Sequence, residues 1–179
     1  VVVVPYPKHF GNKRRAQLLS LFCRRSFQHF AFYSDEMQHA IASCTASQSF
    51  DIIQVEHAQM GFYALPGGSH SILDQHNVEY ELFYRVFRSQ PPSFSKVFHY
   101  MEWRKFQKEE LEICRRFSLC LTTSERDKAV LQSNTPSLNC QVIPNGVDSR
   151  YFVSSDEDEE EDSIVFTGTI NYRPNLDGM

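Results

Sequence analysis

Several polar side chains directly follow apolar, strand-like runs of this sequence, and their types could support acid–base chemistry or hydrogen bonding to a ligand. Glu56 and His57 follow one such run, and the polar residues Asp74 to Asn77 follow the next. An imidazole gains or loses a proton near neutral pH, so His57 and His76 are candidate acid, base or hydrogen-bonding groups. A lone histidine is more often structural, but two histidines after neighbouring strands favour a ligand site.

Other candidates depend on a glycine or on a single polar group. Gly11 and Asn12 stand where a helix is predicted to begin, and backbone N–H groups at the positive end of a helix dipole can bind an anion. A simple turn at Gly11 is an equal alternative. Ser124 is expected only to cap a helix, and the Asn145-Gly146 pair is expected to form a turn.

Alternating strand-like and helix-like segments would hold these groups in place. Apolar runs rich in strand-forming residues predict strands at residues 1–4, 27–33, 52–55, 71–73, 119–122 and 140–143. Helical periodicity predicts helices that begin at residue 12 and after Ser124, and further helices at residues 35–46, 77–88 and 94–117. Repeated strand–helix units predict an α/β fold: a parallel sheet with helices on both faces, which binds ligands at the carboxyl ends of its strands.

Two of these helices carry residues that are expected to face the core. The helix that begins at residue 12 places four apolar side chains on one face: Leu18, Leu19, Leu21 and Phe22. The long helix at residues 94–117 offers another four: Trp103, Phe106, Ile113 and Phe117.

Charge is unevenly distributed along the chain. Its 179 residues carry a formal charge of −4, but seven consecutive acids at 156–162 supply more than all of it, and the remainder carries +3. Basic pairs and triplets at 13–15, 24–25, 104–105 and 115–116 could bind phosphate groups or an anionic membrane surface. A solvated basic face is an equal alternative for each of them.

Cysteine usage and hydropathy indicate the compartment. Five cysteines without a CxxC motif are typical of a reducing cytosol and argue against a disulfide framework or a zinc site. No apolar run approaches the roughly 20 residues that cross a bilayer, and residues 1–4 are too short for a signal-peptide core. We therefore expect a cytoplasmic protein, and the missing initiator Met suggests that its N-terminus is truncated.

The last 40 residues indicate a domain boundary. Ile143 to Asp148, an acidic run and the apolar segment Ile164 to Thr169 follow one another. This order predicts a first domain over residues 1–150 and a solvated, self-repelling linker, rather than a metal site, over residues 151–162. Residues 163–179 would then contain the first strand of a second domain that is cut off at Met179.

An ordered set of motifs carries a family resemblance. The motifs are Tyr6-Pro7 with Gly11, Val55-Glu56-His57, Leu73 to Tyr80, Thr123-Ser124-Glu125, Ile143 to Asp148, and Phe166-Thr167-Gly168 with Arg173-Pro174-Asn175. In this order they resemble the N-terminal half of group-one, family-4-like glycosyltransferases of the GT-B fold. The resemblance covers nearly the whole chain, and IPNGVD followed by FTG and Pro-Asn is its most specific part.

The resemblance implies two Rossmann-like domains with a cleft between them. Such an enzyme transfers a sugar from a nucleotide-sugar donor, usually with retention of configuration and without a metal or other cofactor. His76 would lie close to the transferred sugar, and Gly11 with Asn12 would lie near the donor diphosphate. Gly168 would open the loop of the donor-binding domain.

The acceptor side is expected to lie in the N-terminal domain and to receive a glycan or a lipid-linked acceptor. Its candidate residues are Glu56, His57, Asn77, Arg104 and Lys105. Surface salt bridging is the alternative for Arg104 and Lys105. Peripheral contact with the inner face of an anionic membrane is compatible with the basic clusters, and nucleic acid is not an expected partner.

The chain departs from the family pattern in its last segment. Thr169 stands where the family usually has an arginine, and Arg173 could contact phosphate from a shifted place or be a solvated loop residue. The family's paired carboxylates would lie beyond Met179, so the chain by itself is expected to be inactive. A catalytically inactive GT-B-like scaffold or regulator is the main alternative. A complete α/β hydrolase or flavodoxin-like domain is a weaker one, because the Gly-x-Ser-x-Gly motif of the hydrolases is absent.

Overall fold

The structure of this chain is a computed structural model that describes residues 2–4, 13–153, 162–169 and 175. It contains two compact units, Val1–Asn145 and Gly146–Met179. All helices longer than one turn and all strands of the described residues belong to the first unit.

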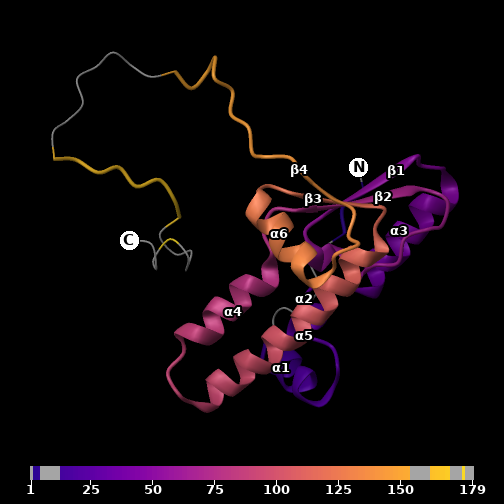
Figure 1. Ribbon diagram of the computed structural model, residues 1–179. Helices are drawn as coiled ribbons and strands as arrows, with labels where there is room; N and C mark the ends of the chain where they lie inside the picture. The colour runs from indigo at the N-terminus through magenta and orange to yellow at the C-terminus, as the bar shows by residue number, and fades with distance from the viewer. Residues whose placement is uncertain (1, 5–12, 154–161, 170–174, 176–179) are drawn as a thin grey trace. The chain divides into compact units, whose positions relative to one another are not determined.

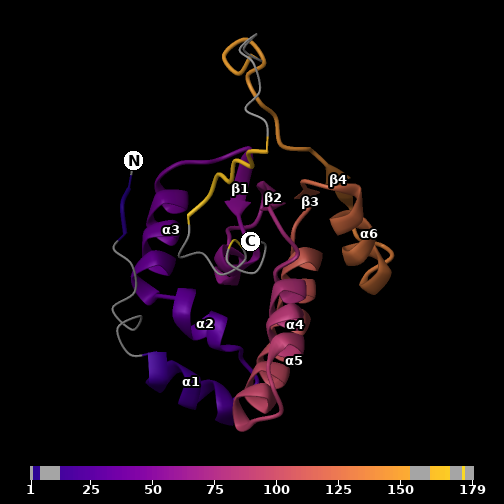
Figure 2. The ribbon, with the colours of Figure 1, turned by 90° about the vertical axis from the view of Figure 1, so that its left-hand side faces the viewer.

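A parallel sheet of four strands forms the centre of the first unit (Figures 1 and 2). Its strands are β1 (Ile52–Glu56), β2 (His70–Gln75), β3 (Leu119–Thr122) and β4 (Cys140–Val142), in the spatial order β1-β2-β3-β4. Every neighbouring pair is parallel. The predicted α/β class and the predicted strand positions near residues 52, 71, 119 and 140 are confirmed, and helices flank the sheet.

Serine side chains begin several of the helices. The long elements are α3 (Asp35–Ser47), α4 (Glu79–Ser89), α5 (Phe94–Arg116) and α6 (Glu125–Asn134). Ser34, Ser93 and Ser124 each accept a hydrogen bond from a backbone N–H three residues later, which satisfies a donor that the first helical turn leaves free. The predicted capping role of Ser124 is therefore confirmed.

The segment predicted as a strand at residues 27–33 is instead a short helix, α2 (Phe27–Phe32). The Ser26 hydroxyl accepts from the His29 N–H at 3.3 Å and donates to a Glu109 carboxylate oxygen at 2.5 Å. The other oxygen of that carboxylate accepts from the Ser26 N–H at 3.0 Å. The strand prediction was wrong because these contacts with α5, distant in sequence, outweigh the β propensity of an aromatic run.

Two further predicted strands are not formed. Residues 2–4 of the strand predicted at residues 1–4, and residues 164–169, which were predicted to begin a second domain, carry no strand hydrogen bonding. Val3 is 83% exposed and Ile164 is 97% exposed, and a strand without a neighbour has no partner for its N–H and C=O groups.

Helix α1 (Lys13–Phe22) buries a different face from the one predicted. Leu18, Leu19, Leu21 and Phe22 are all exposed, whereas Ala16 and Ser20 are buried. The Ser20 carbonyl accepts from the Lys105 ammonium of α5, so this contact turns the small face of α1 inward.

The core lies between the sheet and α5. Leu73 of β2, Cys120 of β3 and Cys114 of α5 are fully buried, and Phe106, Ile113 and Phe117 join them as predicted. Trp103 packs against this cluster and is partly buried. A one-turn helix, η2 (Ala58–Phe62), also packs on α5.

Candidate functional site

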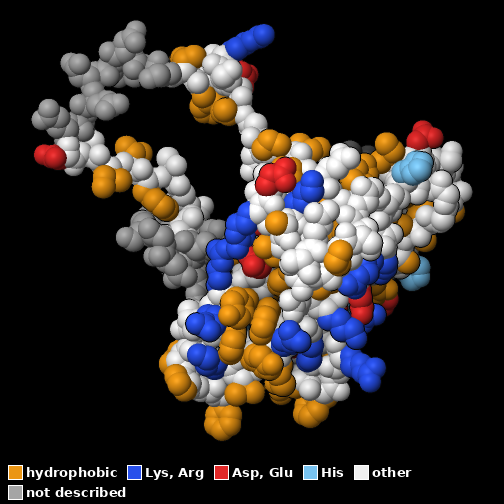
Figure 3. Space-filling view, viewed as in Figure 1, with side chains coloured by type: hydrophobic (Ala, Val, Ile, Leu, Met, Phe, Trp, Pro, Cys, Tyr) orange, Lys and Arg blue, Asp and Glu red, His pale blue; other side chains and the backbone are white. Residues whose placement is uncertain are grey.

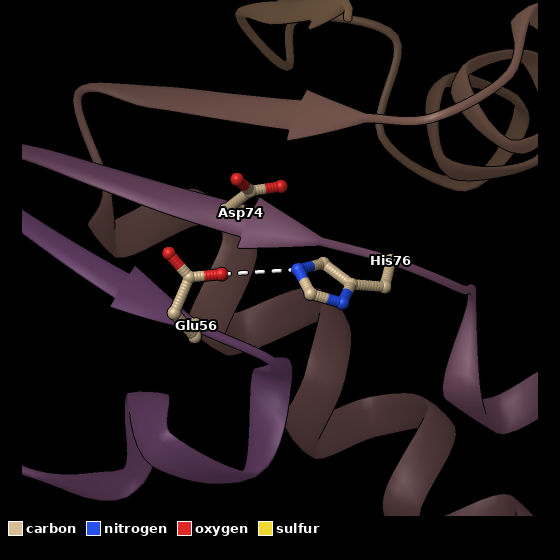
Figure 4. A group of neighbouring side chains, drawn as sticks. All are labelled: Glu56, Asp74 and His76. Atoms are coloured by element: carbon tan, nitrogen blue, oxygen red, sulfur yellow. Dashed lines mark hydrogen bonds and ion pairs between the residues drawn. The ribbon is translucent and has the colours of Figure 1, made fainter. Parts of the chain in front are cut away.

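Three polar side chains meet at the carboxyl ends of β1 and β2. Glu56 is the last residue of β1, Asp74 lies opposite it in β2, and His76 follows directly after β2. Because the two strands are parallel, their ends reach the same edge of the sheet (Figure 4). This edge is where parallel α/β sheets bind ligands.

A hydrogen bond joins two of these side chains. His76 Nε2 lies 3.0 Å from Glu56 Oε2, and the two side chains are about half exposed, at 47% and 51%. Figure 4 shows the second ring nitrogen of His76 facing away from both carboxylates. A carboxylate that accepts from one nitrogen fixes the tautomer and the orientation of the ring, which leaves the other nitrogen for a ligand.

Gln54 links the two carboxylates. Its side-chain amide donates to Glu56 Oε1 at 2.8 Å and to Asp74 Oδ2 at 3.3 Å. Gln54 and Glu56 are two residues apart in β1, so both project from the same face. The amide therefore holds two negative groups side by side and offsets part of their repulsion.

His57 occupies a strained backbone position beside the cluster. Its φ is +66° with ψ +145°, a combination that costs a residue with a side chain on the order of 1–3 kcal/mol. Its N–H donates to the Asp74 carbonyl at 2.9 Å, and its own carbonyl accepts from Met60 N–H at 3.1 Å. The imidazole consequently lies against that of His76, with ring centroids 4.3 Å apart. Strain of this kind is typical of functional sites, where surrounding contacts impose it.

The loop after β2 is tied to the loop after β3. Thr123 Oγ1 donates to the His76 carbonyl at 3.2 Å. Asn77, the next residue, is exposed at the same edge. The structure thus brings together four of the sequence candidates: Glu56, His57, His76 and Asn77.

The cluster also has the donors of a metal site. One atom each from Glu56, Asp74 and His76 lie within 4.8 Å of one another. Two carboxylate oxygens and one imidazole nitrogen suit a divalent cation such as Zn²⁺ or Mn²⁺, which would keep an open coordination position toward solvent. The chain's own chemistry at this edge is therefore either hydrogen bonding by His76 or metal binding that would occupy the same nitrogen.

An apolar groove adjoins the cluster. It has a volume of about 560 Å³, lies along β1 and α3, and includes Glu56 in its lining. Met37, Ile41 and Cys44 of α3 line it, as do Ile53 and Val55 of β1. An apolar ligand segment in this groove would approach the Glu56–His76 pair.

Two acceptor-side candidates lie away from this edge and have structural contacts. Arg104 donates to Gln107 at 3.0 Å and lies 5.4 Å from the Trp103 ring centroid. The Lys105 ammonium contacts the Ser20 carbonyl and lies 3.3 Å from a Glu102 carboxylate oxygen. Along the axis of α5, both residues lie about 15 Å from Cys114, where α5 packs on the sheet.

The donor-side candidates are not brought into a site by the described residues. Gly11, Asn12 and Arg173 lie outside them. Thr169 and Gly168 belong to the second unit, where the Thr169 carbonyl accepts from Asn175 Nδ2 at 3.0 Å. Their assignment to a nucleotide sugar stays a prediction.

Gln54 is a member of the site that the sequence analysis did not indicate, whereas Asp74 and Thr123 were expected at strand ends but were given no specific role there. The spacing of Gln54 and Glu56 offered a signal, because residues two apart in a strand share a face. The contacts of Asp74 depend on the pairing register, and those of Thr123 depend on the spatial order of the strands, neither of which is visible in the sequence.

Among the described residues, no helix combines the length and the apolarity needed to cross a membrane. Comparisons with models of protein families, with curated proteins and with solved structures found no match to this chain.

Proposed function

We propose that this chain is part of a glycosyltransferase that transfers a sugar from a nucleotide-sugar donor to a glycan or lipid-linked acceptor in the cytoplasm, with retention of configuration and without a metal. The observation that carries the proposal is the hydrogen bond between His76 and Glu56 at the carboxyl ends of β1 and β2. The motif resemblance expects a histidine close to the transferred sugar at this position.

The geometry suggests a role for each member of the site. Glu56 accepts a hydrogen bond from the His76 Nε2–H. The Nδ1 atom of His76 then remains available to accept a hydrogen bond from a hydroxyl group of the transferred sugar. The His57 ring packs against His76 and limits its rotation. Orientation of this kind lowers the barrier because the sugar is held ready for transfer before the bond to phosphate breaks.

Negative charge develops on the diphosphate as that bond breaks. The motif resemblance implies that backbone N–H groups at Gly11 and Asn12 and the segment of Gly168, Thr169 and Arg173 stabilise this charge. The acceptor would enter along β1, and the apolar groove beside Glu56 supports an acceptor with an apolar segment, such as a lipid-linked one.

The test uses the full-length protein that contains this chain and measures nucleotide release across a panel of nucleotide sugars. His76→Ala is expected to lower turnover with the preferred donor about 100-fold, and Glu56→Gln about 10-fold, because the ring loses its ligand contact or its orientation. His70→Ala is the matched control, since His70 is exposed at the opposite end of the same strand. Equal turnover in the His70→Ala and His76→Ala variants would contradict the assignment.

A second arm of the experiment separates hydrogen bonding from metal chemistry. Turnover should be unchanged by EDTA if His76 acts through a hydrogen bond. Loss of turnover in EDTA, with recovery on addition of Mn²⁺ or Zn²⁺, would instead show that Glu56, Asp74 and His76 hold a catalytic cation.

The alternative is an inactive GT-B-like scaffold, which the threonine at position 169 favours. Failure of the full-length protein to bind or turn over any donor in the panel would support it.

A further inference from the structure

We propose that α1 and the amino-terminal part of α5 form a surface that docks on an anionic lipid bilayer. The surface consists of apolar side chains from both helices, surrounded by arginine and lysine: Leu18, Leu19, Phe22, Phe94, Val97 and Tyr100. We call it the apolar-basic surface. It does not depend on the proposed sugar transfer and uses none of the residues of the Glu56–His76 site.

The apolar members are unusually exposed. Phe22 is 89% exposed and Phe94 is 95% exposed, and Leu18 and Val97 are more than half exposed at 58% and 56%. Isolated exposed apolar residues are common, but several large ones gathered on two neighbouring helices mark an interaction surface. Figure 3 shows hydrophobic side chains gathered at the lower end of the molecule, flanked by lysine and arginine.

Both helices lie at the same end of the first unit. In Figures 1 and 2, which differ by rotation about the vertical axis, α1 and the connection between α4 and α5 lie at the lower end, away from the sheet. The contact of Lys105 with the Ser20 carbonyl joins α1 to α5. The exposed apolar side chains of both helices therefore belong to the same end of the first unit.

A cluster of aromatic rings backs the surface. The Trp103 and Phe87 rings are stacked with centroids 5.8 Å apart, and Tyr100 packs against both. Tyrosine and tryptophan prefer the interface between water and lipid, where an apolar ring and a polar tip are both accommodated.

The distribution of charged residues around the apolar-basic surface favours an anionic partner. Residues 1–34 and 82–101, which include α1 and the α4–α5 tip, contain none of the 22 acidic residues of the chain. The same two stretches contain nine of its 18 lysines and arginines. Arg24, Arg25 and Arg88 are exposed there. Arg25 lies 3.9 Å from the buried Glu109, and the other cations of these stretches whose side chains the structure describes are Arg24, Arg85, Arg88 and Lys96. Exposed cations beside an apolar surface complement anionic lipid headgroups over an acyl layer.

The same pattern disfavours a second copy of the chain as the occupant, because self-association through this surface would bring like charges together. No described helix is able to span a bilayer, so the docking would be shallow, with the phenylalanines at the boundary between headgroups and acyl chains.

The test measures co-sedimentation of the 179-residue chain with vesicles of phosphatidylcholine alone or with 30% phosphatidylglycerol. We expect binding to the anionic vesicles that weakens with added salt and is much weaker with neutral ones. The double variant Phe22→Ser/Phe94→Ser should bind at least about tenfold more weakly, because two exposed rings no longer leave water. Phe152→Ser, at a position that is 66% exposed in the second unit, is its matched control.

Substitutions of arginine test the contribution of charge to vesicle binding. Arg24→Glu/Arg88→Glu should lose affinity by roughly fivefold or more for each position, whereas Arg150→Glu in the second unit should not. Circular dichroism checks that every variant remains folded. Binding that is unaffected by Phe22→Ser/Phe94→Ser, or absent from anionic vesicles, would overturn the proposal. A dimer in size-exclusion chromatography that Phe22→Ser/Phe94→Ser dissociates would also overturn it, in favour of self-association.

Discussion

Glu110, the most deeply buried acid among the residues that the structure describes, joins two helices. Its carboxylate accepts from the backbone N–H groups of Glu79 and Tyr80 at 3.0 and 2.7 Å, so a residue of α5 caps the first turn of α4. Burial raises the pKa of Glu110 to about 8, although the two N–H groups favour the ionised form. Burial and the Arg25 guanidinium have the opposite effect on a base, and they lower the pKa of His29 to about 4.

These two pKa shifts affect stability in opposite directions. An acid whose folded pKa is raised stabilises the fold below its unfolded pKa, and that contribution is lost as the pH rises through its folded pKa. A base whose folded pKa is lowered destabilises the fold as the pH falls below its unfolded pKa. Between pH 6.5 and 8 Glu110 titrates in the folded state, whereas the folded His29 is neutral and the unfolded His29 loses its remaining charge, so a comparison with a Glu110 variant isolates Glu110.

We predict that the free energy of unfolding falls by about 1 to 2 kcal/mol between pH 6.5 and 8, at up to about 1.4 kcal/mol for each pH unit. Glu110→Gln should flatten this dependence, because an amide does not titrate. Glu112→Gln, at an exposed position of the same helix, should leave the slope unchanged. Urea unfolding at several pH values measures it, and equal slopes for the original chain and Glu110→Gln would contradict the prediction.

At the scale of elements, close approach of two helices depends on a glycine. A Cβ at Gly61 of η2 would lie 2.4 Å from Ile113 Cγ2 of α5, well inside contact distance. The Arg116 guanidinium donates to the Gly61 carbonyl and, at 3.3 Å, to the Tyr63 carbonyl, which ties the same turn to α5. The position of His57 depends on this turn, because His57 directly precedes η2.

We predict that Gly61→Ala lowers the free energy of unfolding by about 1 to 3 kcal/mol, since the added methyl group must displace Ile113 or separate η2 from α5. Gly67→Ala has open space around its Cβ and should change the free energy of unfolding by less than about 0.5 kcal/mol. Thermal unfolding of the two variants decides the matter. Equal free energies of unfolding for Gly61→Ala and Gly67→Ala would contradict the prediction and would mean that α5 moves aside without a measurable loss of stability.

At the scale of the whole molecule, the first unit contains its own core. Every member of the buried hydrophobic cluster lies between Ala58 and Cys140. The large apolar side chains described in the second unit, among them Ile164 and Val165, are exposed. A unit that supplies all of its own buried surface is expected to fold independently.

We predict that a chain ending at Asn145 unfolds cooperatively, with a free energy of unfolding within about 1 kcal/mol of that of the 179-residue chain. Denaturant unfolding followed by far-ultraviolet circular dichroism compares the two. A larger loss would show that residues 146–179 protect part of the core.

Local patterns in the sequence were sufficient for the α/β class, the strands near residues 52, 71, 119 and 140, and the helix that Ser124 caps. Each depends on neighbours along the chain: apolar runs bounded by turns, helical periodicity and a capping hydroxyl. The polar residues after β1 and β2 were predictable as candidates for the same reason, because parallel strands deliver such residues to one edge of a sheet.

Contacts between distant residues decided the rest. The hydrogen bond between Glu109 and Ser26 stabilises the start of a helix at residues 27–32, where local propensity predicted a strand. The contact of Lys105 with the Ser20 carbonyl leaves the apolar side of α1 facing solvent. Pairing register alone places Asp74 beside Glu56, and the contacts of the His57 backbone set its imidazole against His76. The sequence by itself therefore determined which residues stand at the sheet edge. Only the tertiary structure decided which of them touch and which apolar side chains remain exposed, because packing partners far apart in the chain leave no periodic signal along it.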